Sequence, residues 1–357
     1  MFFQKEKKLK VLVGLSGGVD SAVTALLLKK VGHEVSVVFM KNFSSRDNTN
    51  HECPWKTDRD EAYAVAKHLD IPIETWDFEE QYRETVVNYL FETYQKGQTP
   101  NPDILCNSEI KFKLFLAKAL LKGFDKIATG HYAQIKQDKT GFHLLKGKDP
   151  NKDQSYFLAG LNQEQLARSL FPIGHLKKPK VRQIAKKAGL PNADRKDSQG
   201  ICFVGKVNLK DFLSQKISPK IGEIHDVNGK KIGEHEGVWF YTIGQRKGIE
   251  VGGGPALYVV KKDLEKNILV VGPKESLELY NKKLIVHDWH WLNNQYKFPL
   301  KAKAKIRYRQ EDQGLDIIKI NDQEYKAIFK IKQFAPASGQ TLAVYKNKEL
   351  IASAIIQ

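Results

Sequence analysis

The sequence predicts an α/β protein in which a parallel-sheet domain is followed by a small β-rich domain and a C-terminal domain of β-barrel type. Between residues 10 and 130, short apolar runs alternate with segments of helical periodicity, the pattern of parallel strands joined by crossover helices. Beyond Asn208, short alternating strands are separated by turn residues such as Asn228 and Gly229. A chain of 357 residues is long for one core, so two or three domains are expected.

The elements of the first domain follow from the spacing of apolar residues. A further helix is expected to open at Pro179 and to end at Lys187, because Gly189 and Pro191 follow it. We place the domain boundaries at 1–205, 206–280 and 281–357. The expected strands of the first domain are 11–15, 35–40, 73–76 and 126–129, and its expected helices are 21–30, 58–69, 80–94 and 109–121.

The charge balance is strongly basic. Lys and Arg number 58 against 41 Asp and Glu, a net charge of +17, which suits a polyanionic partner such as nucleic acid. A lysine-rich composition on a solvated surface explains the same excess, so charge alone leaves both readings open. No leader pattern and no run of 18 apolar residues occurs, so neither secretion nor a membrane span is expected.

Cysteine usage points to a reducing compartment. The three cysteines, Cys53, Cys106 and Cys202, are too few and too scattered for the disulfide framework of a secreted domain. We therefore expect a cytoplasmic protein. Neither a zinc site nor an iron–sulfur cluster is expected, because these cysteines lack the spacing of metal ligands.

A glycine-rich segment after the first strand predicts a phosphate-binding loop. Gly17 and Gly18 let the backbone approach an anion, and Ser16 and Ser21 offer hydroxyl donors at the start of a helix. An acidic residue beside phosphates is expected to bind them through a Mg²⁺ ion, and Asp20 is the candidate for this role. The alternative is a simple strand-to-helix turn with Asp20 in the first helical turn. The whole segment comprises Gly14, Leu15, Ser16, Gly17, Gly18, Val19, Asp20 and Ser21.

This string resembles the S-G-G-x-D-S loop (PP-loop) of the ATP-pyrophosphatase superfamily, whose domain is Rossmann-like. That resemblance implies cleavage of ATP between its α and β phosphates and transfer of AMP to an oxygen. The superfamily also contains amide-forming ligases, so the loop by itself leaves the substrate open.

Two cysteines lie in distinctive segments. Cys106 ends a proline-braced loop, 99–107, just before the helix expected at Glu109, and a thiol near a helix N-terminus is expected to have a lowered pKa. The alternative is a buried, inert cysteine. Cys202 lies in Asp-Ser-Gln-Gly-Ile-Cys-Phe, 197–203, which by itself is typical of a core segment. Cys53 has no partner and is left out of the chemistry.

Five segments together resemble the tRNA-specific 2-thiouridylase (MnmA) family, nearly from end to end. They are 16–21, 101–112, 129–133, 152–158 and 197–203. The resemblance implies that ATP adenylates the 2-oxygen of a wobble uridine in tRNA, that a sulfur atom replaces this oxygen, and that AMP and pyrophosphate are released. It also implies a sulfur-relay protein that donates a persulfide, and we expect a monomer.

The resemblance assigns roles to residues. Cys202 would carry the persulfide, Cys106 would be the nucleophile and Asp103 the acid/base. ATP would also contact Met40 and Gly130, and a target base leaving its stack would meet Asn101, Pro102 and Asp103. The implied tRNA contacts are His131, Lys152, Asp153, Gln154, Arg307, Tyr308 and Gln340.

Two further expectations concern tRNA. Residues 301–309 alternate basic with apolar or small residues, which on a strand would gather cations on one face for phosphates. The glycine-rich segment 248–256 resembles a mobile element of the family that would close over bound tRNA. The alternatives to a thiouridylase are an amide-forming ligase, which shares the loop but needs no cysteine pair, and a tRNA-binding protein without ATP turnover.

Overall fold

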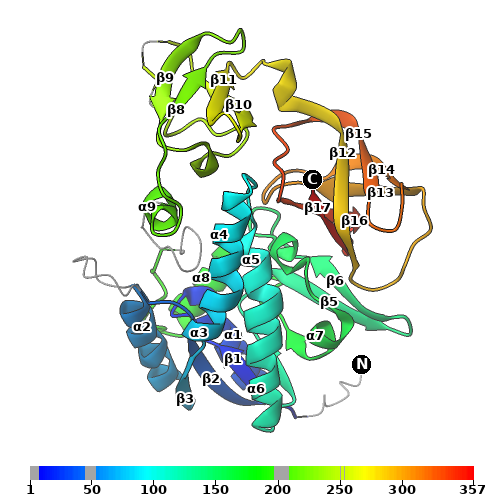
Figure 1. Ribbon diagram of the computed structural model, residues 1–357. Helices are drawn as coiled ribbons and strands as arrows, with labels where there is room; N and C mark the ends of the chain where they lie inside the picture. The colour runs from blue at the N-terminus through cyan, green and yellow to red at the C-terminus, as the bar shows by residue number, and fades with distance from the viewer. Residues whose placement is uncertain (1–7, 45–53, 197–208, 250, 253) are drawn as a thin grey trace.

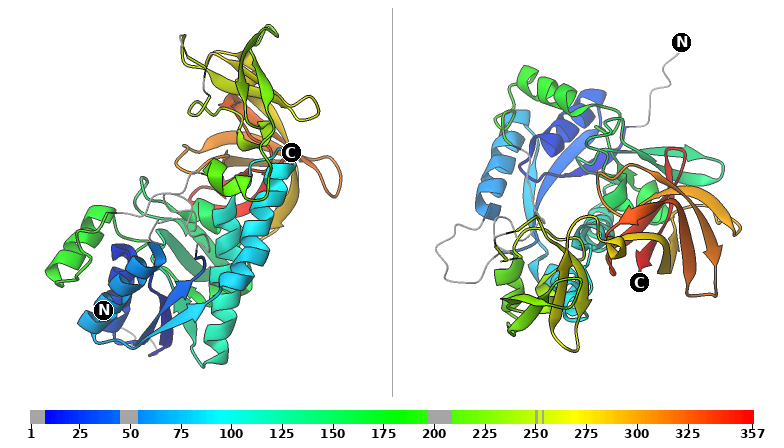
Figure 2. Two further views of the ribbon diagram at one scale, coloured as in Figure 1. Left: turned by 60° about the vertical axis from the view of Figure 1, so that its left-hand side comes forward. Right: turned by 90° about the horizontal axis from the view of Figure 1, so that it is seen from above.

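The computed structural model describes residues 8–44, 54–196, 209–249, 251–252 and 254–357. In Figure 1, the α/β part lies at the bottom, the small sheet of β8 to β11 at the top, and the barrel of β12 to β17 at the right. The left view of Figure 2 shows the small sheet standing away from the α/β part. This arrangement confirms the fold class expected from the sequence.

A five-stranded parallel sheet forms the centre of the α/β part, in the order β3-β2-β1-β4-β7. Strand β1 lies in the middle, with β2 on one side and β4 on the other. Ligands of such sheets bind at the carboxyl ends of the strands where the order reverses, which here is the end of β1. The strands are β1 Lys10–Gly14, β2 Glu34–Lys41, β3 Ile73–Asp77, β4 Lys126–Ala128 and β7 Ser169–Leu170.

Helices cover both faces of this sheet. Alternate residues of β1 point to opposite faces, so Val11 and Val13 pack against α1, α2 and α8, whereas Leu12 packs against the helices from α3 to α6. The three helices on the first face are α1 Val19–Val31, α2 Pro54–Leu69 and α8 Lys178–Lys187. Among the described residues, no helix is both long and apolar enough to cross a membrane.

The helix expected at 80–94 is present as a continuous run, whereas the helix expected to begin at Glu109 begins at Pro102. The early start has a local cause, because the Asn101 side chain caps the helix and Pro102 occupies its first turn. The first run is α3 Glu79–Tyr82, η1 Arg83–Val87 and α4 Asn88–Gln95. The second is α5 Pro102–Leu105, the π-helical η2 Cys106–Leu114 and α6 Phe115–Leu121.

The middle part is a four-stranded sheet in the order β10-β11-β8-β9, preceded by a short helix. The segment 248–256, expected to close over tRNA, leads into β10. Residues 250 and 253 lie outside the described residues, and the closure stays a prediction. The elements are α9 Leu209–Ser214, β8 Gly222–His225, β9 Lys231–His235, η4 Val238–Phe240, β10 Tyr258–Asp263, β11 Ile268–Gly272 and η5 Leu277–Leu279.

The C-terminal part is an antiparallel barrel in the order β12-β15-β14-β13-β16-β17, closed by pairing of β12 with β17. The expected basic strand 301–309 is wrong in its second half, because β13 ends at Lys305 and Lys305 is buried. The barrel strands are β12 Tyr280–Trp291, β13 Leu300–Lys305, β14 Gln313–Lys319, β15 Tyr325–Phe334, β16 Thr341–Lys346 and β17 Glu349–Ile356.

A hairpin from the first part of the chain extends the barrel sheet. Strand β5, Ala133–Asp138, pairs with β6, Gly141–Lys146, and β6 pairs with β17 through Leu144 and Leu145. These two strands were not expected from the sequence. The hairpin and the segment that follows it, with η3 Ser155–Leu158 and α7 Gln163–Ala167, therefore join the α/β part to the barrel.

Candidate active site at the carboxyl end of the parallel sheet

The loop between β1 and α1 requires glycine at one position. Gly17 adopts a φ of +78°, and a Cβ atom there would overlap the backbone of Asp58, so glycine is required. The Ser16 N–H donates to Ser21 Oγ at 3.2 Å, and the Ser21 hydroxyl donates to the Gly18 carbonyl at 2.9 Å. The side chains of Leu15 and Val19 are buried in the core, which leaves only their main-chain groups for a ligand.

The ends of β2 and β4 pack against this loop. A Cβ atom at Gly130 would lie 2.7 Å from the Ser21 nitrogen, and one at Gly14 would lie 2.9 Å from Met40 Cε. The residues expected to hold ATP therefore come together at the switch point of the sheet. The absence of a side chain at Gly17 and Gly130 lets the neighbouring backbone pack directly against this loop and the start of α1, where main-chain N–H groups favour an anion.

Asp20 is bound on both of its carboxylate oxygens. Lys178 Nζ lies 2.7 Å from Oδ1 and 2.8 Å from Oδ2, and the Tyr132 hydroxyl donates to Oδ1 at 2.7 Å. Among the described residues, no cluster of three or more His, Cys, Asp or Glu side chains could hold a metal ion. A Mg²⁺ ion at Asp20 would therefore take most of its ligands from phosphate and water, which is the usual way this ion binds beside a nucleotide.

The turn after α8 holds the loop from the other side. Asn192 Nδ2 donates to the Gly17 carbonyl at 2.8 Å, and Arg195 Nη1 donates to the same oxygen at 3.1 Å. Arg195 also forms an ion pair with Asp58. Sequence reasoning missed these side chains together with Tyr132 and Lys178, because no local pattern marks residues that fold back onto a loop 112 to 178 positions earlier in the chain.

Asn101, Pro102 and Asp103 form the start of the helix that carries Cys106. The Asn101 side chain accepts the Ile104 N–H at 3.4 Å, and Asn101 Nδ2 donates to the Tyr156 hydroxyl at 3.4 Å. Pro102 is buried, while Asp103 in the first turn is partly exposed. Asn101 therefore acts as a helix cap, and Asp103 lies where a ligand can reach it.

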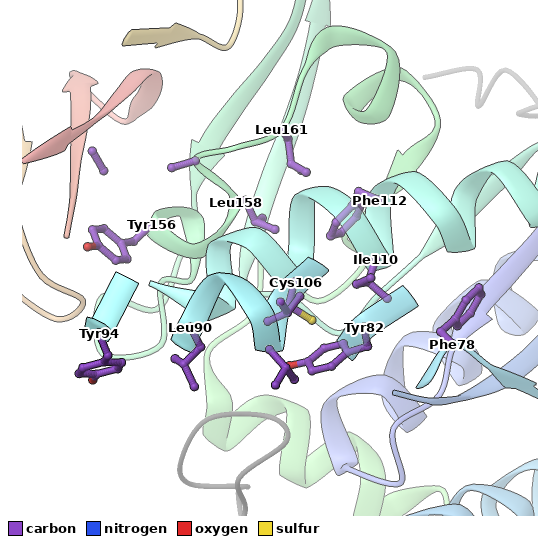
Figure 3. Close-up of a cluster of buried hydrophobic side chains, with 14 of the residues drawn as sticks. Phe78, Tyr82, Leu90, Tyr94, Cys106, Ile110, Phe112, Tyr156, Leu158 and Leu161 are labelled. Atoms are coloured by element: carbon purple, nitrogen blue, oxygen red, sulfur yellow. The ribbon is translucent and has the colours of Figure 1, made fainter. Parts of the chain in front are cut away.

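Cys106 is not at a helix N-terminus, contrary to the expectation. The helix begins four residues earlier, and the helix dipole acts mainly within the first turn. Cys106 is 1% exposed and lies among Tyr82, Leu90 and Ile110 (Figure 3). Cys202 and Cys53 lie outside the described residues, so the relation between the cysteines stays a prediction.

His131 connects the loop region with the Cys106 helix. Thr129 Oγ1 lies 2.7 Å from His131 Nδ1, and the imidazole contacts the rings of Phe112 and Phe171 at centroid distances of 5.8 and 5.9 Å. Burial, together with the charge of Lys111, lowers the pKa of His131 to about 3. The imidazole is thus neutral near pH 7, which makes a role as a cation for tRNA phosphates unsuitable.

The segment expected to contact tRNA at 152–154 is largely tied to the protein. Asp153 is 6% exposed and accepts the N–H groups of Gly147 and Ser155 at 3.0 and 3.2 Å, so the structure gives this carboxylate a structural role. Gln154 Oε1 accepts the Tyr132 N–H at 3.0 Å. Lys152 is partly exposed and is the member of the segment best placed to meet phosphate.

In the barrel, Gln340 contacts the α/β part, whereas Arg307 is held by the barrel itself. Gln340 Nε2 donates to the carbonyls of Thr99 and Pro100 at 2.9 and 2.8 Å. Arg307 donates to the Ala335 carbonyl, and burial lowers its pKa. Gln340 therefore braces the loop before Asn101 in the tRNA-free protein.

Tyr308 follows Arg307 in the turn after β13, where its ring lies against Phe157 at a centroid distance of 4.4 Å. Phe157 belongs to η3, next to the Tyr156 that contacts Asn101. The barrel residues predicted to bind tRNA are thus brought next to the loop predicted to bind the target base.

Three family models together match almost the whole chain. Their descriptions are "tRNA methyl transferase HUP domain" for residues 9–206, "tRNA methyl transferase PRC-barrel domain" for 210–273 and "Aminomethyltransferase beta-barrel domain" for 281–356. Among solved structures, an NMN synthetase from Francisella tularensis covers 60% of this chain and 79% of its own, at 18% identity and a TM-score of 0.37, too low to carry an argument.

Curated relatives match over the full length. The tRNA-specific 2-thiouridylase MnmA of Nitrosomonas eutropha is 46% identical and covers 98% of both chains. Proteins of the same name from Methylobacillus flagellatus and Streptococcus mutans are 45% identical over 98% of this chain, and over 99% and 95% of their own. With identity at this level along the whole chain, and with the phosphate loop and the Cys106 helix meeting at one edge of the sheet, the protein belongs to the tRNA-specific 2-thiouridylase family.

Proposed function

We propose that this protein uses ATP to replace the 2-oxygen of the wobble uridine in tRNA with sulfur, through an adenylated uridine and a cysteine persulfide. The single observation that carries the proposal is the junction at Gly130 and His131. Gly130 packs on the start of α1, and His131 contacts Phe112 on the helix of Asp103 and Cys106. A nucleotide on the loop and a base at that helix would share one edge of the sheet.

In the adenylation step, the uridine 2-oxygen attacks the α-phosphate of ATP and pyrophosphate leaves. The loop 14–21 would hold the phosphates through its main-chain N–H groups, with Met40 and Gly130 beside it. Asp20 would hold Mg²⁺, which supplies positive charge to the phosphates. Asp103, in the first turn of its helix, would exchange a proton with the base held by Asn101 and Pro102.

In the sulfur step, the terminal sulfur of a persulfide on Cys202 attacks carbon 2 and AMP leaves with the original oxygen. The Cys106 thiolate attacks the Cys202 sulfur, which frees the transferred sulfur and leaves a disulfide between the two cysteines. A thiol reductant must cleave this disulfide before the next turnover. A persulfide-donating relay protein would then reload Cys202.

The basic surface supports a tRNA partner, with Lys152, Arg307 and Tyr308 as the proposed contacts. The net charge of +17 favours a polyanion, and Lys152 and Tyr308 are both partly exposed. The Tyr308 ring offers a surface on which an unpaired base can stack. Gln340 is kept as a proposed contact, although it is bound to the protein itself in the tRNA-free state.

The test is incubation of the protein with Mg²⁺, ATP, a persulfide donor and unmodified tRNA, followed by mass analysis of the nucleosides. We expect 2-thiouridine and AMP from the wild type, and no 2-thiouridine from Cys106→Ser or Cys202→Ser. Cys53→Ser is the matched control and is expected to retain activity.

AMP formation without sulfur in the RNA would leave the adenylating half of the proposal standing and overturn the thiolation half. Retention of activity in the Cys106→Ser, Cys202→Ser double variant would favour amide-forming chemistry instead.

A further inference from the structure

Lys178 is a buried cation placed directly at the proposed nucleotide site. The residue is 8% exposed, and its ammonium lies within 2.8 Å of both Asp20 oxygens. Tyr132, 1% exposed, shares the Asp20 carboxylate through its hydroxyl, and its ring centroid lies 6.0 Å from the ammonium. In the free protein, the Lys178 ammonium therefore already neutralises the negative charge of Asp20 that would bind a metal ion.

The fold buries Lys178 and leaves the neighbouring lysines of the same run exposed. Its N–H donates to Asp149 Oδ2 at 2.8 Å, and the buried Asp149 thereby anchors the first residue of α8. Lys177 and Lys180, in the same run, are exposed. A lysine whose main chain is fixed in this way can direct its ammonium to one place with little loss of side-chain freedom on binding.

A bound triphosphate would offer the Lys178 ammonium a second anionic partner besides Asp20. A triphosphate carries more negative charge than one divalent ion neutralises, and a buried ammonium is stable only beside an anion. Phosphate oxygens next to Gly17 and Gly18 would lie within reach of the same side chain, whether or not a divalent ion occupies Asp20. We propose that Lys178 is a nucleotide-binding residue, which is held on Asp20 in the free protein and contacts phosphate oxygens when ATP binds.

This inference rests on the proposed use of ATP at this loop, but not on tRNA or on either cysteine. It is tested by equilibrium binding of α,β-methylene-ATP, which cannot be cleaved between its α and β phosphates, measured by calorimetry on the whole protein. Lys178→Met is compared with Lys177→Met, which removes an exposed lysine one position away. Each variant is measured with Mg²⁺ and with a chelator.

We expect Lys178→Met to bind the analogue at least about tenfold more weakly than the wild type in both conditions, as befits loss of a hydrogen bond between charged groups. Lys177→Met is expected to bind like the wild type. Lys178→Arg should recover part of the affinity. A loss confined to the Mg²⁺ condition would mean that Lys178 only orders Asp20, and it would overturn the phosphate contact.

A second comparison remains informative if the single variant folds poorly because the partly buried Asp20 carboxylate is left unpaired. The Asp20→Asn, Lys178→Met double variant retains neither charge of this pair, and Asp20→Asn leaves only the ammonium, which a bound phosphate would neutralise. With chelator present, Asp20→Asn should bind the analogue at least as tightly as the wild type, since the ammonium is released and a negative charge is removed. Adding Lys178→Met should then lower the affinity about tenfold.

Equal affinity of the Asp20→Asn single and double variants would overturn the inference while leaving the nucleotide site intact. Failure of the wild type to bind the analogue at all would instead remove the nucleotide site, and both proposals with it.

Discussion

At the scale of single residues, the loop 14–21 depends on Gly17 for two separate reasons. Its φ of +78° disfavours any other residue, and a Cβ atom would also overlap the Asp58 backbone. Gly123 isolates the first reason, because its φ is +84° and nothing lies within 4 Å of the position of its Cβ.

We expect Gly123→Ala to lower the free energy of unfolding by about 1 kcal/mol through backbone strain alone. Gly17→Ala should lower it further and should also abolish nucleotide binding, because the loop must move away from Asp58. Thermal unfolding and binding of an ATP analogue measure the two effects. Equal destabilisation by the two substitutions, with binding intact in both, would contradict the role given to the loop.

His131 offers a prediction about pH. Burial lowers its pKa to about 3 in the folded protein, whereas an ordinary histidine in the unfolded chain has a pKa near 6.5. Below about pH 6.5 the unfolded chain therefore binds a proton that the folded protein does not bind. The contribution of His131 is a loss of stability as the pH falls from 6.5 toward 3.

NMR spectra of the folded protein should accordingly show one imidazole that does not titrate between pH 5 and 8, and His131→Phe should remove that signal. The exposed His175 in the same spectra provides a reference for an accessible imidazole. A midpoint near 6.5 for the His131 signal would show that the ring is reached by water.

At the scale of elements, the turn between β15 and β16 is docked on the loop that leads to the Cys106 helix. The Thr99 N–H donates to the Ser338 carbonyl at 2.8 Å, and Gln340 holds the next two carbonyls of that loop. The Tyr156 hydroxyl donates to the Thr341 carbonyl at 3.0 Å. The barrel thus helps to position the residues predicted to hold the target base.

Gln340→Ala is expected to lower kcat for tRNA thiolation several-fold with little change in KM, because Thr99 and Pro100 lose their brace. Gln323→Ala, at an exposed site on the same barrel, should leave both constants unchanged. The opposite result, a raised KM with unchanged kcat, would identify Gln340 chiefly as a tRNA contact, as the sequence predicted.

At the scale of the whole molecule, a group of buried and partly buried charges joins the hairpin β5–β6, the 152–154 segment and the barrel. Lys146 pairs with Asp312, and Lys305 lies 3.6 Å from both Asp312 and Asp153. Both ammonium groups also lie near the buried ring of Tyr345, at 4.3 and 5.6 Å from its centroid. Removing one member of such a group leaves its partner charged and buried.

Asp312→Asn is therefore expected to destabilise the protein by about 3 kcal/mol. The melting curve should also broaden or split, as the barrel separates from the α/β part before either unfolds. Asp322→Asn, at an exposed ion pair of the same barrel, should leave the melting temperature nearly unchanged. A single unshifted transition for Asp312→Asn would show that other contacts hold the barrel in place.

The sequence by itself determined the parallel sheet, the β-rich remainder, the loop 14–21 and the family, because these follow from local periodicity and from contiguous motifs. The tertiary structure decided which side chains surround that loop. Lys178, Tyr132, Asn192 and Arg195 reach Asp20 and Gly17 from distant segments, and no local pattern encodes such contacts. Packing likewise buried the Asp153 carboxylate and lowered the pKa of His131, since burial depends on how the whole chain packs rather than on residue type.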